Sequence, residues 1–364
     1  MDVGMLLVFQ NWFDNVSDEE VFTRELKMGV AAERYGFDSV WSAEHHFDDY
    51  SMCPDNLQIM AWIAGQTSRI KLGTGAVTLP WNDPLRVVEK VQMLDHMSGG
   101  RVLFGMGRGL AKMEYEGFRV DMNESRDRFD EAAEMIIRGL RNGYVENDGP
   151  YYKQPRVNVR PGPGASPRSW DGRLFGVAMS PDSIPAVAEL GAQMMTFMQY
   201  DFPQHAEALN RWRGLHREKH GTEPGPALIQ DFVYCHEDPD EAKAIAHEHI
   251  SRYFLSVIKH YDFAGSHWRE TRGYEAYQAG ADMIREAGME AAASAYVEAN
   301  VYGTPEQIVE KYAERREIGG DFMANVAFCF GGLPLDRAEA SMKLFGEKVV
   351  PELHKMTART PAAV

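Results

Sequence analysis

Two histidines near the N-terminus have side chains suited to proton transfer. Within the stretch Ser39–Tyr50, apolar residues give way to Glu44, His45 and His46. A strand that becomes ionisable at its carboxyl end is typical of how parallel α/β enzymes present chemistry. Successive strand side chains point to opposite faces, so the two histidines cannot both address one point, which weakens a two-histidine metal site. One histidine facing a pocket as acid, base or hydrogen-bond donor fits better, and the alternative is a histidine satisfied inside packed structure.

A second group of residues is suited to binding an anion. The glycines of Gly105–Leu110 let a ligand approach the backbone, and Arg108 offers a two-pronged donor for phosphate or carboxylate. Arg126 begins a predicted helix, where the helix dipole disfavours a cation unless an anion lies near. Ser180 and Ser183 open another predicted helix, whose N-terminus can hold an anion, although capping alone explains them equally well. These residues are compatible with a phosphate site, while a tight turn and a solvated Arg108 remain the alternative.

Such groups meet only on a scaffold that gathers strand ends, and the hydrophobic pattern predicts one. The predicted strands span residues 3–10, 39–43, 70–79, 101–109, 174–180, 193–199, 227–236 and 322–330. The predicted helices span residues 17–35, 56–68, 84–97, 125–142, 183–190, 205–220, 239–261 and 336–354, with a further one from residue 304. Strands that alternate with helices in this way predict an α/β fold, a (β/α)8 TIM barrel.

We expect one barrel domain over residues 1–356. Two segments break the alternation of strands and helices, at about 146–171 and 262–300, and we predict insertions there. The first is rich in proline, glycine and aromatic residues and predicts a hairpin or an extended excursion. Residues 357–364 are predicted to be a disordered tail.

The composition is that of an acidic chain of enzyme size. Its 364 residues carry a formal net charge of -16, so a nucleic acid or an acidic membrane surface would be repelled. No apolar run approaches the roughly twenty residues of a membrane-spanning helix. Cys53, Cys235 and Cys329 lie far apart without a CxxC pair, so we predict neither a disulfide framework nor a metal site. We expect a cytoplasmic protein with no nucleic-acid or membrane partner.

Seven segments carry a resemblance to a known family, in the family's order and from near the N-terminus to the last helix. They are Gly36–Trp41, Glu44–Phe47, Leu72–Pro80, Met93–Arg101, Arg108–Leu110, Asp121–Arg126 and Ala340–Phe345. On these segments the chain resembles the bacterial luciferase-like flavin monooxygenases, and within them most closely the luciferase α subunit. The resemblance implies a TIM barrel that binds reduced flavin, forms a flavin C4a-hydroperoxide with oxygen, and inserts one oxygen atom into an organic substrate.

The resemblance also implies roles for individual residues. His45 matches the family's catalytic histidine beside the flavin. Gly75 and Ala76 match the pair joined by a non-prolyl cis peptide beneath the isoalloxazine ring. The positions that match flavin-phosphate ligands are Arg108, the amide of Leu110, Arg126, Ser180 and Ser183. Those that match the backbone along the ring are Ala178 and Met179.

Several positions depart from the luciferase α subunit. Gly107 replaces its reactive cysteine, Met179 replaces an acidic residue, and Phe197-Met198 replaces a Ser-Trp pair. The second insertion keeps the run that begins at Thr271 but lacks the paired arginines of luciferase's mobile loop. These departures weigh against light emission and a long-chain aldehyde substrate, and they leave flavin binding and monooxygenation in place.

Three functions compete on this basis, and a fourth, a metal-dependent barrel hydrolase, ranks last because no His-x-His stands at a strand end. The first is a two-component monooxygenase that receives reduced FMN from a separate NADPH- or NADH-dependent flavin reductase and uses O2 on a small organic substrate, with FAD as a possible replacement for FMN. The chain has no nicotinamide fingerprint, which fits reduced flavin arriving from elsewhere. The second is a deazaflavin-dependent hydride-transfer dehydrogenase on the same barrel. The third is a non-catalytic flavin-binding subunit, against which His45 and the Arg108/Arg126 pair argue.

We also expect a homodimer or larger assembly. The family typically pairs barrels through the helices that follow the early strands. Apolar residues in those two predicted helices offer a surface for this contact. They are Met60, Trp62, Ile63, Val87, Val88 and Val91.

Overall fold

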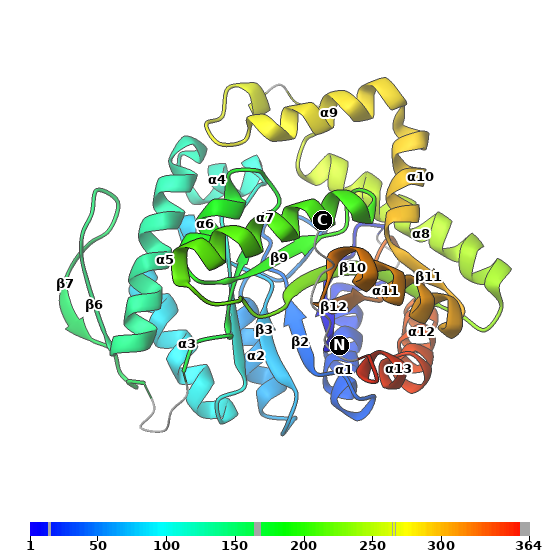
Figure 1. Cartoon of the computed structure of the whole chain (residues 1–364), viewed down its shortest axis with the longest axis horizontal. Helices are drawn as coiled ribbons and strands as arrows, with labels where there is room; N and C mark the ends of the chain where they lie inside the picture. The colour runs from blue at the N-terminus through cyan, green and yellow to red at the C-terminus, as the bar shows by residue number, and fades with distance from the viewer. Residues whose placement is uncertain (14–15, 164–168, 264, 266, 357–364) are drawn as a thin grey trace.

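The computed structural model describes residues 1–13, 16–163, 169–263, 265 and 267–356, and within them parallel strands close into a barrel (Figure 1). Strand β1 pairs in parallel with β2 on one side and with β12 on the other, and β9 pairs with β10, so the eight-stranded sheet has no free edge. The (β/α)8 prediction is confirmed. The barrel strands are β1 (Val3–Leu7), β2 (Ser39–Ser42), β3 (Lys71–Thr74), β5 (Val102–Gly107), β8 (Leu174–Val177), β9 (Gln193–Phe197), β10 (Ala227–Cys235) and β12 (Phe322–Ala327).

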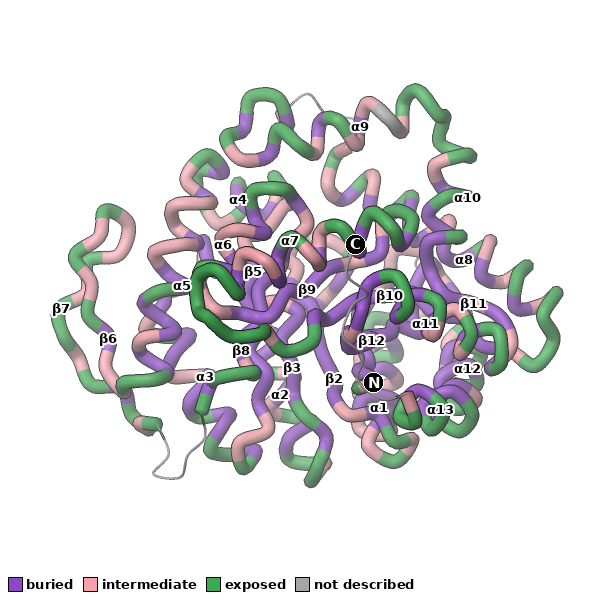
Figure 2. The backbone as a smooth tube through the Cα atoms, viewed as in Figure 1, coloured by how far each residue is buried: buried purple, intermediate pink, exposed green. Residues whose placement is uncertain are grey.

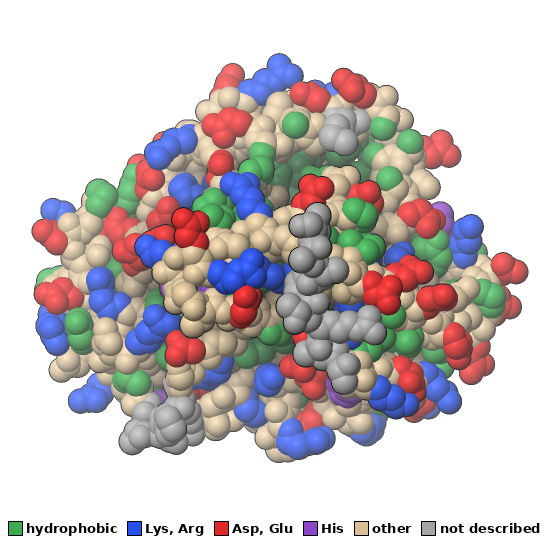
Figure 3. Space-filling view, viewed as in Figure 1, with side chains coloured by type: hydrophobic (Ala, Val, Ile, Leu, Met, Phe, Trp, Pro, Cys, Tyr) green, Lys and Arg blue, Asp and Glu red, His purple; other side chains and the backbone are tan. Residues whose placement is uncertain are grey.

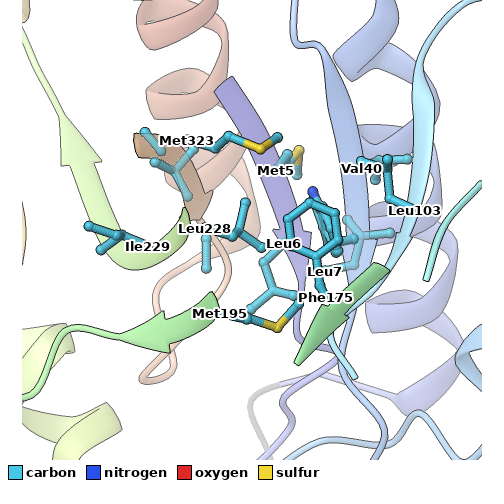
Figure 4. Close-up of a cluster of buried hydrophobic side chains, with 14 of the residues drawn as sticks. Met5, Leu6, Leu7, Val40, Leu103, Phe175, Met195, Leu228, Ile229 and Met323 are labelled. Atoms are coloured by element: carbon cyan, nitrogen blue, oxygen red, sulfur yellow. The ribbon is translucent and has the colours of Figure 1, made fainter. Parts of the chain in front are cut away.

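Apolar side chains fill the inside of the barrel. Figure 4 shows Leu6, Phe175, Met195 and Leu228 converging from four different strands, and each is at most 4% exposed. The strands appear as a buried centre in the burial view (Figure 2). Parallel strands covered on both faces are apolar almost throughout, which explains why their runs were recognisable in the sequence.

Several of the covering helices begin at a residue whose side chain caps the first turn. The side chain of Ser17 accepts a hydrogen bond from the backbone of the first turn of α1, and Asp55 and Asp83 do the same for α2 and α3. Thr304 and Gln307 form a reciprocal capping box at the start of α11. The helices around the barrel are α1 (Asp18–Arg34), α2 (Asn56–Ala64), α3 (Pro84–Ser98), α5 (Ser125–Asn142), α6 (Ser183–Glu189), α7 (Phe202–His220), α8 (Pro239–His260), α11 (Pro305–Gly319) and α12 (Leu335–Lys348).

Two excursions leave the barrel where the sequence predicts them. The first is an antiparallel hairpin of β6 (Tyr144–Asp148) and β7 (Lys153–Asn158), which projects at the left of Figure 1. The second contains α9 (Glu275–Ala287) and α10 (Met289–Ala299), and α9 runs along the top of the same view. Residues 164–168 of the first insertion and the predicted tail at 357–364 lie outside the described residues.

Four features differ from the prediction. The single strand expected at residues 70–79 is two, because a cis peptide between Gly75 and Ala76 separates β3 from β4 (Val77–Thr78), which is followed by the short turn of helix η1 (Leu79–Trp81). The loop after β5 contains an unpredicted helix, α4 (Lys112–Phe118).

The other two differences lie near the C-terminus. A short strand, β11 (Val301–Gly303), pairs with the end of β10. The last predicted helix is broken between α12 and α13 (Val350–His354), because Pro351 has no N–H to continue the hydrogen-bond ladder.

The structure buries most of the residues that were expected to form a dimer contact. Of the six apolar residues expected there, all but Trp62 are buried within the barrel's own layers. The exposed large apolar residues on these helices are instead Trp62 on α2 and Met93 and Met97 on α3, which are 44%, 50% and 58% exposed. On the face in Figure 3, acidic and basic side chains are interspersed. No helix among the described residues has both the length and the apolar character needed to cross a membrane.

Candidate active site

A cavity lies at the carboxyl ends of the barrel strands, beneath the second insertion. Residues from β1, β8 and β9 line one part of it, and the loops after β2, β3 and β5 line another. Parallel barrels place their reactive groups at this end. The predicted site residues among its lining are His45, Gly75, Ala76, Arg108, Leu110, Arg126, Met179 and Ser183.

His45 is held in the cavity between a carboxylate and a phenol. Its Nδ1 lies 3.0 Å from Oε1 of Glu114, and its Nε2 lies 3.4 Å from the hydroxyl of Tyr261. Glu114 sits on α4 and is 1% exposed. Burial raises the pKa of Glu114, but the charge and the hydrogen bond of His45 outweigh this and hold that pKa below its usual range. The side chain of His45 is 18% exposed, so it keeps contact with the cavity.

His46 is turned out of the cavity. Its ring packs edge-on against Phe118 and Trp81, with centroids 4.6 and 5.9 Å away. Its Nε2 lies 3.2 Å from Oε1 of Glu44. Glu44 is buried and also accepts hydrogen bonds from the side chains of Trp81 and Asn82 and from the backbone of a further residue. The two neighbouring histidines therefore have different environments, one in the cavity and one in a packed polar cluster.

A second imidazole lies behind Glu114. His260 packs its ring on Tyr50 at 4.3 Å, and its Nδ1 lies 3.1 Å from Oδ2 of Asp48. Burial lowers the pKa of His260. One ligand atom from each of His45, Glu114 and His260 lies within 4.8 Å of the others. This grouping of two imidazoles and a carboxylate is also compatible with a metal ion. No metal site was predicted from the sequence, so the grouping was not foreseen.

Arg108 and Arg126 bring two positive charges to the other part of the cavity. Nη2 of Arg108 donates to the carbonyl of Gly273 at 2.8 Å, and its guanidinium lies 3.9 Å from the centre of the Tyr274 ring. Nη1 of Arg126 lies 3.5 Å from Oδ1 of Asp130. Burial, and then the charge of Arg108, lower the pKa of Arg126. Among the described residues, the buried Nη1 of Arg108 and Nη2 of Arg126 have no hydrogen-bond partner.

Backbone geometry directs Arg108 toward the cavity. Gly109 has a φ of 81°, a conformation that glycine adopts without strain, and a Cβ there would come within 2.8 Å of Trp81 and of Thr78. The carbonyl of Gly109 also accepts a hydrogen bond from the hydroxyl of Tyr274, which ties the second insertion to this turn.

The remaining predicted residues lie along the end of β8. Ser183 lines the cavity at the start of α6, and its hydroxyl donates to the carbonyl of Ser180 at 2.8 Å. The amide of Ser180 donates to the Ser183 hydroxyl oxygen at 2.9 Å. Met179 lines the cavity, with its sulfur 3.2 Å from the Thr196 hydroxyl. Ala178 and Ser180 are buried beside these residues and do not belong to the lining.

Aromatic rings make up much of the rest of the lining. Most come from α8 and the second insertion, and two come from β9 and β10. These side chains give the cavity a largely aromatic lining, which suits a planar ligand. The rings are Tyr50, Phe129, Phe197, Phe232, Tyr253, Tyr261, Phe263, Tyr277 and Tyr296.

Comparison with known proteins identifies the family. The family described as luciferase-like monooxygenase matches residues 1–321. The chain belongs to the luciferase-like monooxygenase family. This confirms the resemblance seen in the sequence, and the chain is accordingly an oxidoreductase of that family. The alkanal monooxygenase alpha chain of Photorhabdus laumondii is 27% identical over 356 residues, which cover 93% of this chain and 94% of that protein.

Solved structures of luciferase-like monooxygenases and related proteins share the fold. Monooxygenase RslO1 from Streptomyces bottropensis superposes with a TM-score of 0.77 at 25% identity, over 97% of this chain and 100% of that one. The oxygenating constituent of 3,6-diketocamphane monooxygenase from Pseudomonas putida, solved with FMN, gives 0.72 at 19% identity, over 99% of both. An F420-dependent secondary alcohol dehydrogenase gives 0.70 at 16% identity, over 97% and 98%, and so shares the barrel fold.

Proposed function

We propose that the protein is a flavin-dependent monooxygenase that binds reduced FMN and uses O2 to oxygenate a small organic substrate. The observation that carries the proposal is the pair of buried guanidinium nitrogens of Arg108 and Arg126, unpartnered among the described residues, in the same cavity as His45. Among the described residues, no carboxylate lies within hydrogen-bonding distance of these two nitrogens. Two like charges placed in this way favour the binding of an anion, and a phosphate monoester supplies two negative charges. A structural neighbour solved with FMN supports a flavin phosphate as the proposed anion.

The residues of the cavity fit reduced FMN along its length. Arg108 and Arg126 would hold the phosphate, with the amide of Leu110 and the hydroxyls that open α6 as further donors. Ala76 and Met179 offer an apolar seat for a planar ring near His45. FAD would need additional room beyond the phosphate, so FMN is the form that we propose. Reduced flavin, when bound, supplies the electrons that activate O2 for transfer of one oxygen atom.

The chain's own part in the reaction is binding and proton control. The arginines orient the cofactor, the aromatic lining limits access of water, and His45 exchanges a proton with the reacting groups. We propose that a separate NADPH- or NADH-dependent flavin reductase supplies the reduced cofactor. The substrate class that the aromatic lining favours is a planar, largely apolar molecule, in preference to a long-chain aldehyde.

We further propose a homodimer or larger assembly. Trp62 on α2 and Met93 and Met97 on α3 are large apolar side chains exposed on two helices that pack against each other. Exposed apolar groups on adjacent helices are typical of an interface, and this is the location at which the family's barrels are expected to meet.

The cofactor proposal is tested by anaerobic titration of the protein with reduced FMN. Arg108→Ala should weaken binding by at least tenfold, since a charge-assisted hydrogen bond contributes about 1.5–3 kcal/mol. Turnover under 18O2 with a panel of planar and linear substrates should then place one labelled oxygen atom in the product, as read by mass spectrometry.

The competing function is hydride transfer to or from a deazaflavin. Anaerobic turnover with a deazaflavin, without oxygen consumption and without label in the product, would replace the proposed reaction. Binding of reduced FMN without any turnover would instead favour a non-catalytic flavin-binding subunit.

A further inference from the structure

The contacts of His45 define where its proton lies. Its Nδ1 faces Oε1 of Glu114 at 3.0 Å, and the same oxygen accepts the backbone N–H of His46 at 2.8 Å. Because Oε1 already accepts this backbone N–H, it faces Nδ1 of His45 as an acceptor, and the nearby positive charge of a protonated His45 favours the ionised form of Glu114. The proton of a neutral His45 therefore lies on Nδ1, and the lone pair of Nε2 faces the cavity.

Tyr261 completes the other side of the ring. Its hydroxyl lies 3.4 Å from Nε2 of His45, and Tyr261 lines the cavity at the end of α8. Burial, and then nearby Tyr253 and Glu114, raise the pKa of the Tyr261 phenol well above its usual value. The phenol therefore keeps its proton and donates it to Nε2. The result is a carboxylate, an imidazole and a hydroxyl in line, the arrangement by which a buried carboxylate fixes the tautomer of a histidine that activates a hydroxyl.

Other titratable groups surround the ring, and Tyr50 also makes a side-chain hydrogen bond with Tyr261. From the loop after β2, Tyr50 faces His45 edge-on at 5.1 Å, and Asp48 is paired with His260. From α8, Nε2 of His260 lies 3.9 Å from Oε1 of Glu114, beyond hydrogen-bonding distance. Burial lowers the pKa of His260, which disfavours a cationic His260 beside Glu114.

We propose that Glu114, His45 and Tyr261 act as one proton-transfer unit, in which Glu114 is a positioning residue and Tyr261 faces the reactant. A reactant proton passes to the Tyr261 oxygen while the Tyr261 proton passes to Nε2 of His45. The bond from the reactant to its proton breaks, the imidazolium forms, and Glu114 stays ionised and stabilises it. The reverse transfer returns the proton. The reactant rests on the proposed monooxygenase function, whereas the tautomer and the hydrogen bonds do not.

The test uses protein labelled with 15N-histidine, without cofactor, and two-bond 1H–15N NMR, which distinguishes the protonation state of each imidazole nitrogen. The signals of His45 are assigned by their loss in His45→Gln. In the wild-type protein the neutral ring should be protonated on Nδ1. Glu114→Gln should increase the share of the tautomer protonated on Nε2. Glu114→Asp, which keeps the charge, should restore most of the Nδ1–H population.

Tyr261→Phe removes only the hydroxyl. It should leave the Nδ1–H tautomer in place, move the Nε2 resonance because a hydrogen bond is lost, and reduce turnover at least tenfold. The matched controls are Glu298→Gln and Tyr302→Phe. Glu298, Tyr302 and His247 form a similar grouping at the surface, with His247 Nε2 3.0 Å from Glu298. These two variants should leave the His45 signals and turnover unchanged.

Three results would overturn the proposal. The first is a neutral His45 protonated mainly on Nε2. The second is a Glu114→Gln or Tyr261→Phe variant in which the His45 signals are those of wild type. The third is a stoichiometric transition metal in the purified protein whose removal shifts both His45 and His260, which would make the cluster a metal site. The expected spectra in a protein that fails to turn over with reduced FMN would contradict the proposed function alone.

Discussion

The Arg126→Gln substitution should weaken the binding of reduced FMN without weakening the fold. Nη2 of Arg126 is buried and has no hydrogen-bond partner in the described part of the chain, and Nη1 lies 3.5 Å from Asp130. If these atoms hold the flavin phosphate, the variant loses a charge-assisted hydrogen bond of about 1.5–3 kcal/mol. At about 1.4 kcal/mol per factor of ten, the Kd for reduced FMN should rise by about 10- to 150-fold. The Kd for reduced riboflavin, which has no phosphate, should stay the same.

The same substitution should not harm folding. An unpaired buried donor costs about 1–3 kcal/mol, and Arg126 also repels Arg108. The free energy of unfolding of the cofactor-free protein should therefore stay level or rise by about 1 kcal/mol in urea denaturation. Arg128→Gln is the matched control one half-turn along α5, where the arginine pairs with Glu124 outside the cavity. This control should leave both flavin affinities unchanged.

Two results would refute the argument for Arg126. If reduced FMN and reduced riboflavin weaken by the same factor, Arg126 shapes the cavity and does not contact phosphate. If the free energy of unfolding of the variant falls by several kcal/mol while the ratio of its Kd values for reduced FMN and reduced riboflavin stays that of wild type, Arg126 is a structural cation. Anaerobic fluorescence titration supplies the affinities, and the denaturation curves supply the free energies on the same preparations.

Three further predictions concern other parts of the molecule. Burial raises the pKa of Glu25 from 4.5 to about 8, so between these values the folded state holds a proton that the unfolded state has lost. The free energy of unfolding should therefore fall from pH 5 to 8 by at most about 1.4 kcal/mol per pH unit. Glu25→Gln should remove that part of the pH dependence. His45→Ala should reduce turnover by about 10²-fold with little change in reduced-FMN affinity, whereas His46→Ala should lower the free energy of unfolding by about 1–3 kcal/mol. If His46→Ala loses turnover and His45→Ala loses stability instead, the two rings do not have the environments described above. Trp62→Glu combined with Met97→Glu should convert a dimer to a monomer in light scattering, and a wild-type monomer at micromolar concentration would contradict the proposed assembly.

The barrel was predictable from the sequence because its signals are local. Buried parallel strands are continuous apolar runs, and caps such as Ser17, Asp55 and Asp83 mark helix starts within one turn. The misses occur where no local signal exists. α4 begins after Ala111, whose side chain cannot cap, and follows a glycine-rich loop that predicts no helix. The apolar residues expected to form the dimer contact, such as Val88, are buried because helices α2 and α3 use them to cover the barrel, a distinction that a single sequence does not encode.

The residues of the candidate site also divide into those with a local signal in the sequence and those without one. Gly75, Ala76 and Arg108 stand at strand ends, where a barrel gathers its chemistry, so their residue types and the resemblance together place them in one cavity. Glu114 and Tyr261 carry no such mark, because a glutamate on a short helix and a tyrosine after a long one are ordinary surface and core residues.

They matter through contacts that span 69 and 216 positions of sequence, both made to the ring of His45. The sequence drew attention to the histidine, but in our proposal its tautomer depends on these two distant groups. The proposed chemistry of this imidazole is therefore a property of the closed barrel with α4 and α8 in place, and Glu114→Gln tests that dependence without altering His45 itself.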